Sequence, residues 1–529
     1  MTVEALTDKR ASWAFGLGVL GVTIGVLLHL PMFWMGRDNG FMLAGMPMDP
    51  GMIFGMFLIV GGIFAAAYGL LPTRIGDQMK AAKRIMVVAP EDARLGPAHW
   101  SLMVALVAAL VIDVMKPASL GFVMPGMVRE YGVPKAEASL VPFFALVGTV
   151  VGSLIWGVLA DLYGRKASIL LSAVVFIGTS ICGAMPSLTW NIGMCFLMGA
   201  GAGGMLPVAY ALLAETMPSA HRGWILVLVG GLGAVGGYFA ASGCSTLLAP
   251  TFSWRILWLL NLPTGLILIL MGRLIPESAK FLLARGRQAE AHAVMARFGA
   301  HSRALSEDED DPAEVFVHAS HHVHPPKLWT PALVGRTLAL SVAAVAWGFV
   351  NFGLLLWLPS DLVAQGYSIG ASSALLARSA LVALPTVFLC AFLYSRWSAK
   401  WSLVGVIGLM LAGLAWVLLL TISGRGDPLL PVALLIIGSN GLLAILLPYA
   451  AECYPLRVRG RATGLVAACT KGGGVFAQAL SIAALTPTLG LAAVGIMAPT
   501  LLALGLVVRF GVETRGLDLR RLEPEVSSG

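Results

Sequence analysis

Charged side chains lie inside otherwise apolar stretches of this sequence. Asp113 and Lys116 stand three residues apart in AALVIDVMKPASLGF (108–122), and Arg378 and Lys471 lie in two later stretches. If these stretches cross a membrane, each charge costs at least about 2.5–3.5 kcal/mol, and such groups are usually kept for function. Burial favours the neutral form of a carboxyl group, whereas a neighbouring lysine favours its charged form. This balance predicts that Asp113 carries a proton and that Lys116 keeps it ionisable; the alternative is a permanent ion pair that only orients the helix.

The charges inside the apolar stretches do not balance. If Asp113 offsets Lys116, Arg378 and Lys471 remain without an acidic partner at a similar depth. Because buried charges are normally paired, we expect the missing partner to be a cargo carboxylate, which an arginine can hold with two parallel hydrogen bonds. The alternative is that these cations reach the interface or cap backbone carbonyls. Other polar residues of the spans could bind the cargo or merely link helices: Tyr210, Asn351, Asn440 and Gln478.

The composition indicates that lipid surrounds most of the chain. Of the 529 residues, 58% are hydrophobic and 12% are charged, and the mean hydropathy is +0.85. Soluble domains are typically about 25% charged, so this chain lacks the polar residues to cover itself in water. Apolar windows of about 20 residues, long enough to span a bilayer, number about fourteen. They are expected near 12–34, 51–72, 101–127, 138–160, 167–186, 190–214, 223–248, 253–275, 332–358, 369–394, 401–422, 429–452, 461–484 and 488–510.

Polar segments divide these spans into groups. The predicted organisation is two N-terminal transmembrane helices (1–73), a cytoplasmic linker (74–100), an N-terminal six-helix bundle (101–275), a cytoplasmic central loop (276–331), a C-terminal six-helix bundle (332–510) and a cytoplasmic tail (511–529).

Lysine and arginine are distributed unevenly between the predicted loops. With the N-terminus inside, the outer loops hold only these of the 35 basic residues: Arg37, Arg129, Lys135, Arg255 and Arg425. This bias predicts a multi-pass protein of the inner (plasma) membrane with both termini cytoplasmic. The formal charge of +8 then belongs to a surface that faces anionic lipid. The expected partners are the bilayer and a small molecule, not nucleic acid.

An internal repeat relates the two predicted bundles. AETMPSAHRG ends the fourth span of the first bundle, and AECYPLRVRG ends the fourth span of the second. At the same spacing, Glu215, Pro218, Arg222 and Gly223 recur as Glu452, Pro455, Arg459 and Gly460. Parallel repeats of this kind indicate a transporter with its substrate site at the midplane. A carboxylate at the inner end of a helix can pair with the following arginine in one conformation and release it in another; a static surface pair is the alternative.

The segment GVLADLYGRK (157–166) resembles the loop signature between the second and third helices of the major facilitator superfamily. The matching residues are Gly157, Leu159, Asp161, Gly164, Arg165 and Lys166. The resemblance implies that these positions govern conformational switching, and Glu215, Arg222, Glu452 and Arg459 are expected to take part. The second-half copy, YSRWSAKWS (394–402), keeps only Arg396 and Lys400. That loss weakens the prediction that the second half contains a conformational switch as strong as the one in the first half.

Further segments are similar to particular groups of this superfamily. PESAKFLLARGRQAEA (276–291) resembles the PESPR-type segment of sugar-porter-like and metabolite:proton symporters, with Ala279 and Lys280 in place of the usual proline and arginine. GAGAGGMLPVAYALLAE (199–215) and WGFVNFGLLLWLP (347–359) are similar to organic-acid and aromatic-acid:proton symporters. The resemblance implies an all-α membrane protein with two six-helix bundles in pseudo-twofold arrangement, plus two additional N-terminal helices.

These features together predict a secondary active transporter and not an enzyme. It would couple the uptake of a small organic anion, a carboxylate such as an aromatic acid, to proton entry by alternating access. No cofactor is expected beyond the proton as coupling ion. Two alternatives remain open: a proton-driven exporter of amphipathic compounds, and a non-transporting membrane sensor on the same scaffold.

The loop between the first two spans, HLPMFWMGRDNGFMLAGMPMDPGM (29–52), is rich in methionine and contains His29. Soft thioethers could collect copper(I), but flexible apolar packing is the preferred interpretation, and no metal site is predicted. An accessory or stabilising role, with a possible protein partner, is expected for this helix pair.

Overall fold

The computed structural model describes residues 9–71, 85–88, 94–284, 286–304, 328–424, 426–454, 456–484 and 488–514. The chain folds into two compact units. The first contains Met1–Ser219, Gly237–Arg303 and Pro359–Ala374, and the second contains Ala220–Gly236, Ala304–Leu358 and Leu375–Gly529. Parts of the predicted linker (72–84 and 89–93), central loop (305–327) and tail (515–529) lie outside the described residues.

Helices make up nearly all of both units. The first unit contains α2 (Lys9–Leu27), α3 (Leu30–Met35), η1 (Gly36–Asn39), α4 (Pro50–Leu70), β1 (Ile85–Val88), α6 (Pro97–Tyr131), α7 (Lys135–Ala138), α8 (Leu140–Tyr163), α9 (Arg165–Gly178), η2 (Thr179–Ala184), α10 (Leu188–Ala202), α11 (Met205–Thr216), α13 (Ile256–Leu259), α14 (Asn261–Met271), α15 (Ala279–Ala284), α16 (Gln288–Phe298) and most of β2 (His301–Ala304). The second unit contains α18 (Pro331–Gly348), η3 (Phe349–Leu355), α21 (Ala399–Ser423), α22 (Leu429–Cys453), α23 (Leu456–Ile482) and α24 (Leu489–Phe510). Residues of α12 (Ser219–Phe252), α19 (Leu358–Ala364) and α20 (Ile369–Arg396) are divided between the units.

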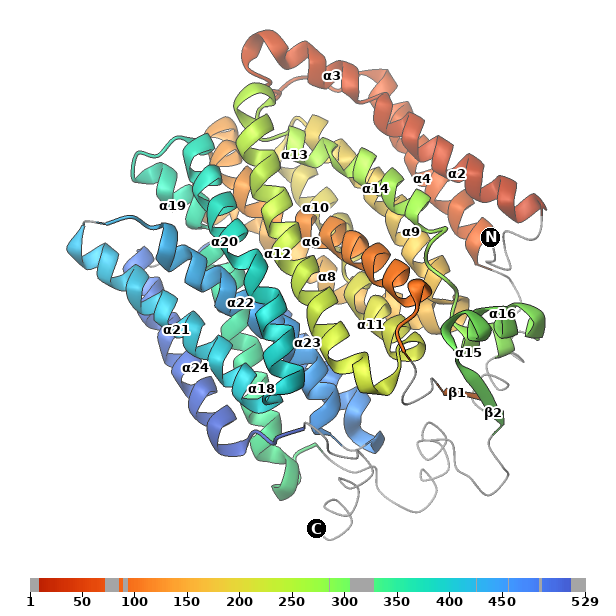
Figure 1. Cartoon of the computed structure of the whole chain (residues 1–529). Coiled ribbons are helices and arrows are strands. Elements are labelled where there is room, and N and C mark those ends of the chain that lie inside the picture. Colours follow the sequence, from red (N-terminus) through yellow and green to blue (C-terminus); the bar gives the residue numbers. More distant parts are fainter. Residues whose placement is uncertain are drawn as a thin grey trace. The chain divides into compact units, whose positions relative to one another are not determined.

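The helices account for the predicted spans. Among the described residues, thirteen helices are long and apolar enough to cross a membrane, and Ile256–Met271 is a shorter apolar helix. This agrees with the expectation of about fourteen spans, since the shorter helix occupies the position of the eighth predicted span. A lipid-embedded chain must satisfy its backbone groups internally, which favours helices. The all-α prediction holds for the spans, while β1 and β2 form a two-stranded sheet near α15 (Figure 1).

The two extra N-terminal helices pack against each other and against α9 (Figure 1). Their contact is made by small residues: a Cβ added to Gly18 would lie 2.5 Å from the Ala66 nitrogen, and one added to Gly25 would lie 2.6 Å from the Gly55 carbonyl oxygen. Small residues allow this close backbone approach in membranes. The pairings show that α2 and α4 are antiparallel, and their buried side chains belong to the same apolar cluster as those of α9.

A buried ion pair holds the loop between these helices to the rest of the first unit. Glu130, at the end of α6, lies 2.6 Å from Arg255, and their side chains are 3% and 0% exposed. The same carboxylate accepts hydrogen bonds from the backbone nitrogens of Leu43 (2.7 Å) and Ala44 (3.1 Å) and from the Trp254 indole (2.9 Å). The N-terminal helices are therefore an integral part of the first unit.

Candidate functional site

Asp113 and Lys116 lie on α6 and are almost completely buried, with 6% and 2% of their surfaces exposed. The Lys116 ammonium lies 2.8 Å from the centroid of the Phe176 ring on α9. The Lys116 ammonium interacts electrostatically with the charge of Asp113. Within the described part of the chain, its nitrogen has no hydrogen-bond partner. The next residue, Pro117, has no N–H to donate to the Asp113 carbonyl. The two side chains thus lie one turn apart on the same helix.

Two tyrosine hydroxyls of the first unit are also buried without a hydrogen-bond partner among the described residues. They belong to Tyr210 on α11 and Tyr238 on α12. The Tyr238 ring lies 5.7 Å from that of Phe122 on α6. Phe122, Phe176 and Tyr238 were not predicted as site residues, because an aromatic residue in a span gives no sequence signal beyond packing.

In the second unit, Lys471 lies on α23 beside two aromatic rings. Its ammonium is 6.0 Å from the centroid of Trp347 and 5.5 Å from that of Phe352, within the range of a cation–π contact. The Trp347 indole N–H is buried and has no hydrogen-bond partner among the residues described. The close approach depends on glycines, since a Cβ added to Gly348 would lie 2.5 Å from the Thr470 carbonyl oxygen. A cation and a buried donor therefore lie close together on adjoining helices.

The aromatic residue Phe352 belongs to η3, a π-helical segment. Gln478 on α23 donates a hydrogen bond to the Phe352 carbonyl and accepts one from the Trp357 indole (3.3 Å). The predicted cargo ligand Gln478 is fully buried and holds this segment in place. Asn351 lies in the same segment and is half-buried. π-Helical segments are frequent at functional sites.

The two other predicted cargo residues of the second unit lie elsewhere. Arg378 is exposed on α20, as are Leu381 and Val382 one turn further along the helix. This placement is typical of an arginine whose apolar stem lies along lipid while the charge reaches toward water. Asn440 is buried on α22. Within the described part of the chain, neither residue forms a hydrogen bond, ion pair or cation–π contact with the group around Lys471.

The loop signature is held by a glutamate from the PESAK segment. Glu277 is buried and its Oε1 accepts hydrogen bonds from the backbone nitrogens of Arg165 (2.7 Å), Lys166 (3.3 Å) and Ser278 (3.0 Å). Gly164 has φ +99°, and a Cβ there would lie 2.5 Å from the Glu277 carboxylate. Burial raises the pKa of Glu277, against the lowering effect of these N–H groups and of Arg165. A carboxylate at the start of α9 is favoured by the helix dipole.

The same segment connects to the predicted switch residue Glu215. Arg165 lies 3.3 Å from the Glu215 carboxylate, and the Ser278 hydroxyl donates to it. Lys166 is buried. An added Cβ at Gly157 would meet open space, so no close contact explains that glycine in this conformation. The side chain of Asp161 lies outside the described residues.

The second unit contains an arrangement like that of the first, built from different residues. Glu513 accepts hydrogen bonds from the Ser398 hydroxyl and from the Ala399 nitrogen (3.0 Å) at the start of α21. The next residue, Thr514, donates to Glu452 (2.7 Å), which also accepts from Tyr394 (2.6 Å). The loop signatures alone do not reveal this network. The two units share only a glutamate followed directly by a hydroxyl residue, Glu277–Ser278 in the first and Glu513–Thr514 in the second.

The repeated arginines Arg222 and Arg459 both belong to the second unit. Burial and the charge of Arg222 lower the pKa of Arg459, while Glu452 raises it. Arg459 and Glu452 form no ion pair within the part of the chain that the structure describes. Pro455, the repeated proline, lies outside the described residues.

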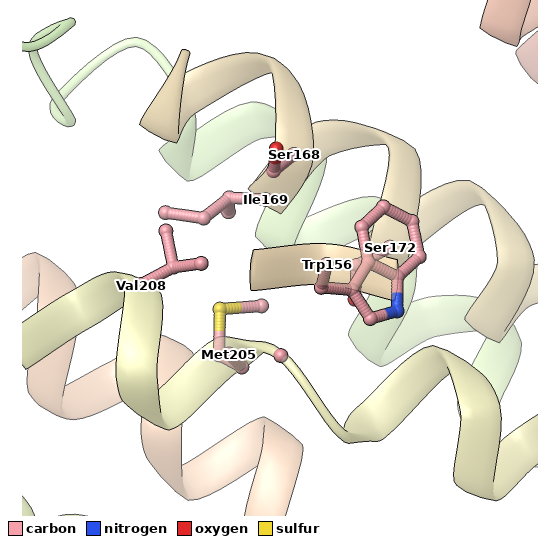
Figure 2. Close-up of a pocket in the computed structure, with 7 residues that line it drawn as sticks. Trp156, Ser168, Ile169, Ser172, Met205 and Val208 are labelled. Carbon is pink, nitrogen blue, oxygen red and sulfur yellow. The ribbon is translucent and has the colours of Figure 1, made fainter. Parts of the chain in front are cut away.

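A small pocket of the first unit lies at the break between α10 and α11 (Figure 2). Its empty volume is about 170 Å³, below the roughly 300–1,000 Å³ of ligand pockets. Trp156 and Ser172, which line it, donate hydrogen bonds to the carbonyls of Ala200 (2.6 Å) and Gly201 (2.9 Å). Their polar groups stabilise the break in this helix. The pocket is not a substrate site of the expected size.

Comparison with known proteins decides the family. The model of the Major Facilitator Superfamily matches residues 102–478, which include the loop signature, Lys116 and Lys471. The chain belongs to the Major Facilitator Superfamily. It is therefore a multi-pass membrane transporter and not an enzyme, as the sequence predicted.

Three superfamily members of similar sequence are named for aromatic acids. The niacin transporter NiaP of Acinetobacter baylyi is 28% identical over 393 residues, covering 73% of this chain and 87% of the relative. The 4-hydroxybenzoate transporter PcaK of Pseudomonas aeruginosa is 28% identical over 399 residues, covering 73% and 86%. The benzoate transport protein of A. baylyi is 25% identical over 388 residues, covering 71% and 81%.

Solved structures of the superfamily share the fold. The proton:xylose symporter XylE, bound to a bromodeoxyglucose, matches with a TM-score of 0.62 at 16% identity, covering 81% of this chain and 98% of that protein. The inward-open structure of XylE from E. coli matches with the same TM-score at 15% identity, covering 80% and 99%. These matches confirm the major facilitator fold.

Proposed function

We propose that this transporter carries a small aromatic carboxylate into the cell together with a proton, by alternating access. The observation that carries the proposal is the group formed by Lys471, Trp347 and Phe352. The ammonium and the partnerless indole N–H offer two donors to one carboxylate, and hydrogen bonds to charged groups are the stronger ones. The Phe352 ring offers a face for stacking with the aromatic part of the cargo. Niacin, benzoate and 4-hydroxybenzoate, after which relatives are named, all combine these two parts.

Other predicted residues take supporting roles in this proposal. Asn351 lies on the same π-helical segment as Phe352 and is available for a further polar contact with the cargo. Gln478 keeps that segment in shape. Tyr210 in the first unit and Asn440 in the second remain candidate cargo contacts, and Arg378 acts at the bilayer surface or on the approach of the anion.

Proton coupling is assigned to Asp113 and Lys116. Both are buried on α6, so moving a proton to or from either changes the net charge of a dry environment. Such a change is costly and can be tied to a change of conformation. The signature residues Gly157, Asp161, Gly164, Arg165 and Lys166 then govern switching.

Four repeated residues complete the proposed switch: Glu215, Arg222, Glu452 and Arg459. In the present conformation, Glu215 binds Arg165, and Glu452 is held by hydroxyl groups. Both networks must rearrange if the helices they join move apart. We place these networks on the cytoplasmic side of the inner membrane, with both termini on that side, on the basis of the basic-residue bias.

The test is uptake by purified protein in proteoliposomes. Radiolabelled nicotinate or benzoate should accumulate above its equilibrium level when the outside is made acidic, and a protonophore should abolish the accumulation. Nicotinamide, which lacks the carboxylate, should not accumulate and should compete only weakly. Efflux of preloaded cargo driven by the same outside-acid gradient would indicate the exporter, and binding without any flux would indicate the sensor; either result would overturn the proposal.

A further inference from the structure

The turn after α2 contains a histidine with a nitrogen lone pair that no described residue uses. His29 is fully buried, and its Nδ1 lies 2.7 Å from the Gly25 carbonyl oxygen. A carbonyl oxygen only accepts, so in the neutral ring Nδ1 carries the proton and Nε2 carries the lone pair. Nε2 is buried and has no hydrogen-bond partner in the described ranges. A histidine fixed through Nδ1–H to a backbone carbonyl is the usual arrangement of a metal ligand.

Methionines flank the contact between His29 and α4 in the sequence. The His29 ring packs on α4 at Gly55, where an added Cβ would lie 2.9 Å from the ring Cε1 and 3.1 Å from Nδ1. Met32 follows His29 by one turn, Met52 precedes Gly55 by one turn, and both are fully buried in one apolar cluster. Because α2 and α4 are antiparallel, both methionines lie on the same side of this contact. Partly buried methionines pack on the cluster as well: Met46, Met48 and Met56.

We propose that His29, Met32 and Met52 form a binding site for a soft monovalent metal ion, copper(I) or its analogue silver(I). Neutral imidazole and thioether ligands suit copper(I), whereas a harder ion would require carboxylate or water oxygens. These ligands bring no negative charge. Asp49, which caps the start of α4, acts electrostatically on His29 and offsets the charge of a bound cation.

The loop also supplies a route to this buried site. Met35 and Met42 are 58% and 39% exposed, and they lie in the chain between the second and third ligands, Met32 and Met52. Soft ligands of graded exposure can pass a copper(I) ion inward by ligand exchange.

The experiment uses the full-length protein in detergent under anaerobic, reducing conditions. Cys244 and Cys469, the two partly buried thiols, are first blocked with N-ethylmaleimide. Copper(I) is then titrated in competition with the chelator bicinchoninate. The variants Met32→Leu and Met52→Leu conserve volume and packing but remove sulfur. Met410→Leu, at a fully buried methionine of α21, is the matched control.

The expected result is one copper(I) ion per chain with one nitrogen and two sulfur ligands in its X-ray absorption spectrum. Each cluster variant should bind at least tenfold more weakly, and copper(I) should raise the melting temperature of the wild type and of Met410→Leu but not of His29→Leu. The proposal is overturned if the wild type does not compete with the chelator. It is also overturned if Met32→Leu and Met52→Leu bind as tightly as Met410→Leu.

Discussion

Replacing Lys471 with methionine tests the cargo site most directly. The change keeps an unbranched side chain beside Trp347 and Phe352 and removes only the charge. A hydrogen bond to a charged group contributes about 1.5–3 kcal/mol, which corresponds to about 10- to 150-fold in affinity. Lys471 is only half-buried, so solvent screening favours the lower end. We expect nicotinate binding to weaken about tenfold.

The measurement is isothermal titration of nicotinate and nicotinamide to purified protein. The amide has no charge to lose, so its weak binding should change less than threefold in the same variant. Lys400→Met is the matched control, because this lysine also faces a ring, Trp401 at 5.7 Å, at the start of α21. Equal losses for acid and amide, or an equal loss in the control, would refute recognition of the carboxylate by Lys471.

Three further predictions concern buried carboxylates. Asp113→Asn should abolish accumulation driven by a pH gradient while cargo exchange continues, and the double change with Lys116→Met should restore lost stability. The pKa of Glu277 in the folded protein is raised above its ordinary value of 4.5. At a pH between the unfolded-state and folded-state pKa values, Glu277 therefore binds a proton more strongly in the folded protein than in the unfolded chain. The melting temperature should therefore fall as the pH rises through this window, and less steeply in Glu277→Gln. Glu130→Gln leaves Arg255 as a buried unpaired cation and should lower the free energy of unfolding by about 3–5 kcal/mol.

Each of these results has a contrary outcome. A stable Asp113→Asn, Lys116→Met variant that still concentrates cargo up a proton gradient would show that Asp113 is not the carrier. Identical pH slopes for wild type and Glu277→Gln would remove Glu277 as the titrating group. For Glu130, the control is Glu137→Gln at an exposed position of α7, and equal melting temperatures for the two variants would disprove the importance of the buried pair.

The fold followed from the sequence because its signals are local. The number of spans follows from runs of apolar residues, and the loop signature around Gly164 fixed the family. The arrangement of Lys471 did not follow in the same way. Its depth along α23 was predictable, but its contact with Trp347 depends on a glycine-mediated approach of two helices and on the π-helical turn, which no periodicity reveals.

Two site residues show the same limit. Depth along a helix places Arg378 near the middle of the span, yet the direction of its side chain depends on which face of α20 is packed, and the arginine is exposed. The role of Glu513 was missed for another reason. A glutamate after the last span has no signature of its own, and it could only be recognised once the structure placed it on the start of α21.

The anchoring of the N-terminal loop by Glu130 has a consequence for biogenesis. The ribosome makes the first two helices and Glu130 early, but Arg255 follows Glu130 by 125 positions. At about 5–20 residues per second, Glu130 spends about 6–25 s in the nascent protein before its cation exists. During that interval the loop cannot make all of its final contacts. The first two helices are therefore inserted early, but their loop is stabilised by the ion pair only late. A translation product that stops before Arg255 leaves the Glu130 carboxylate without this cation.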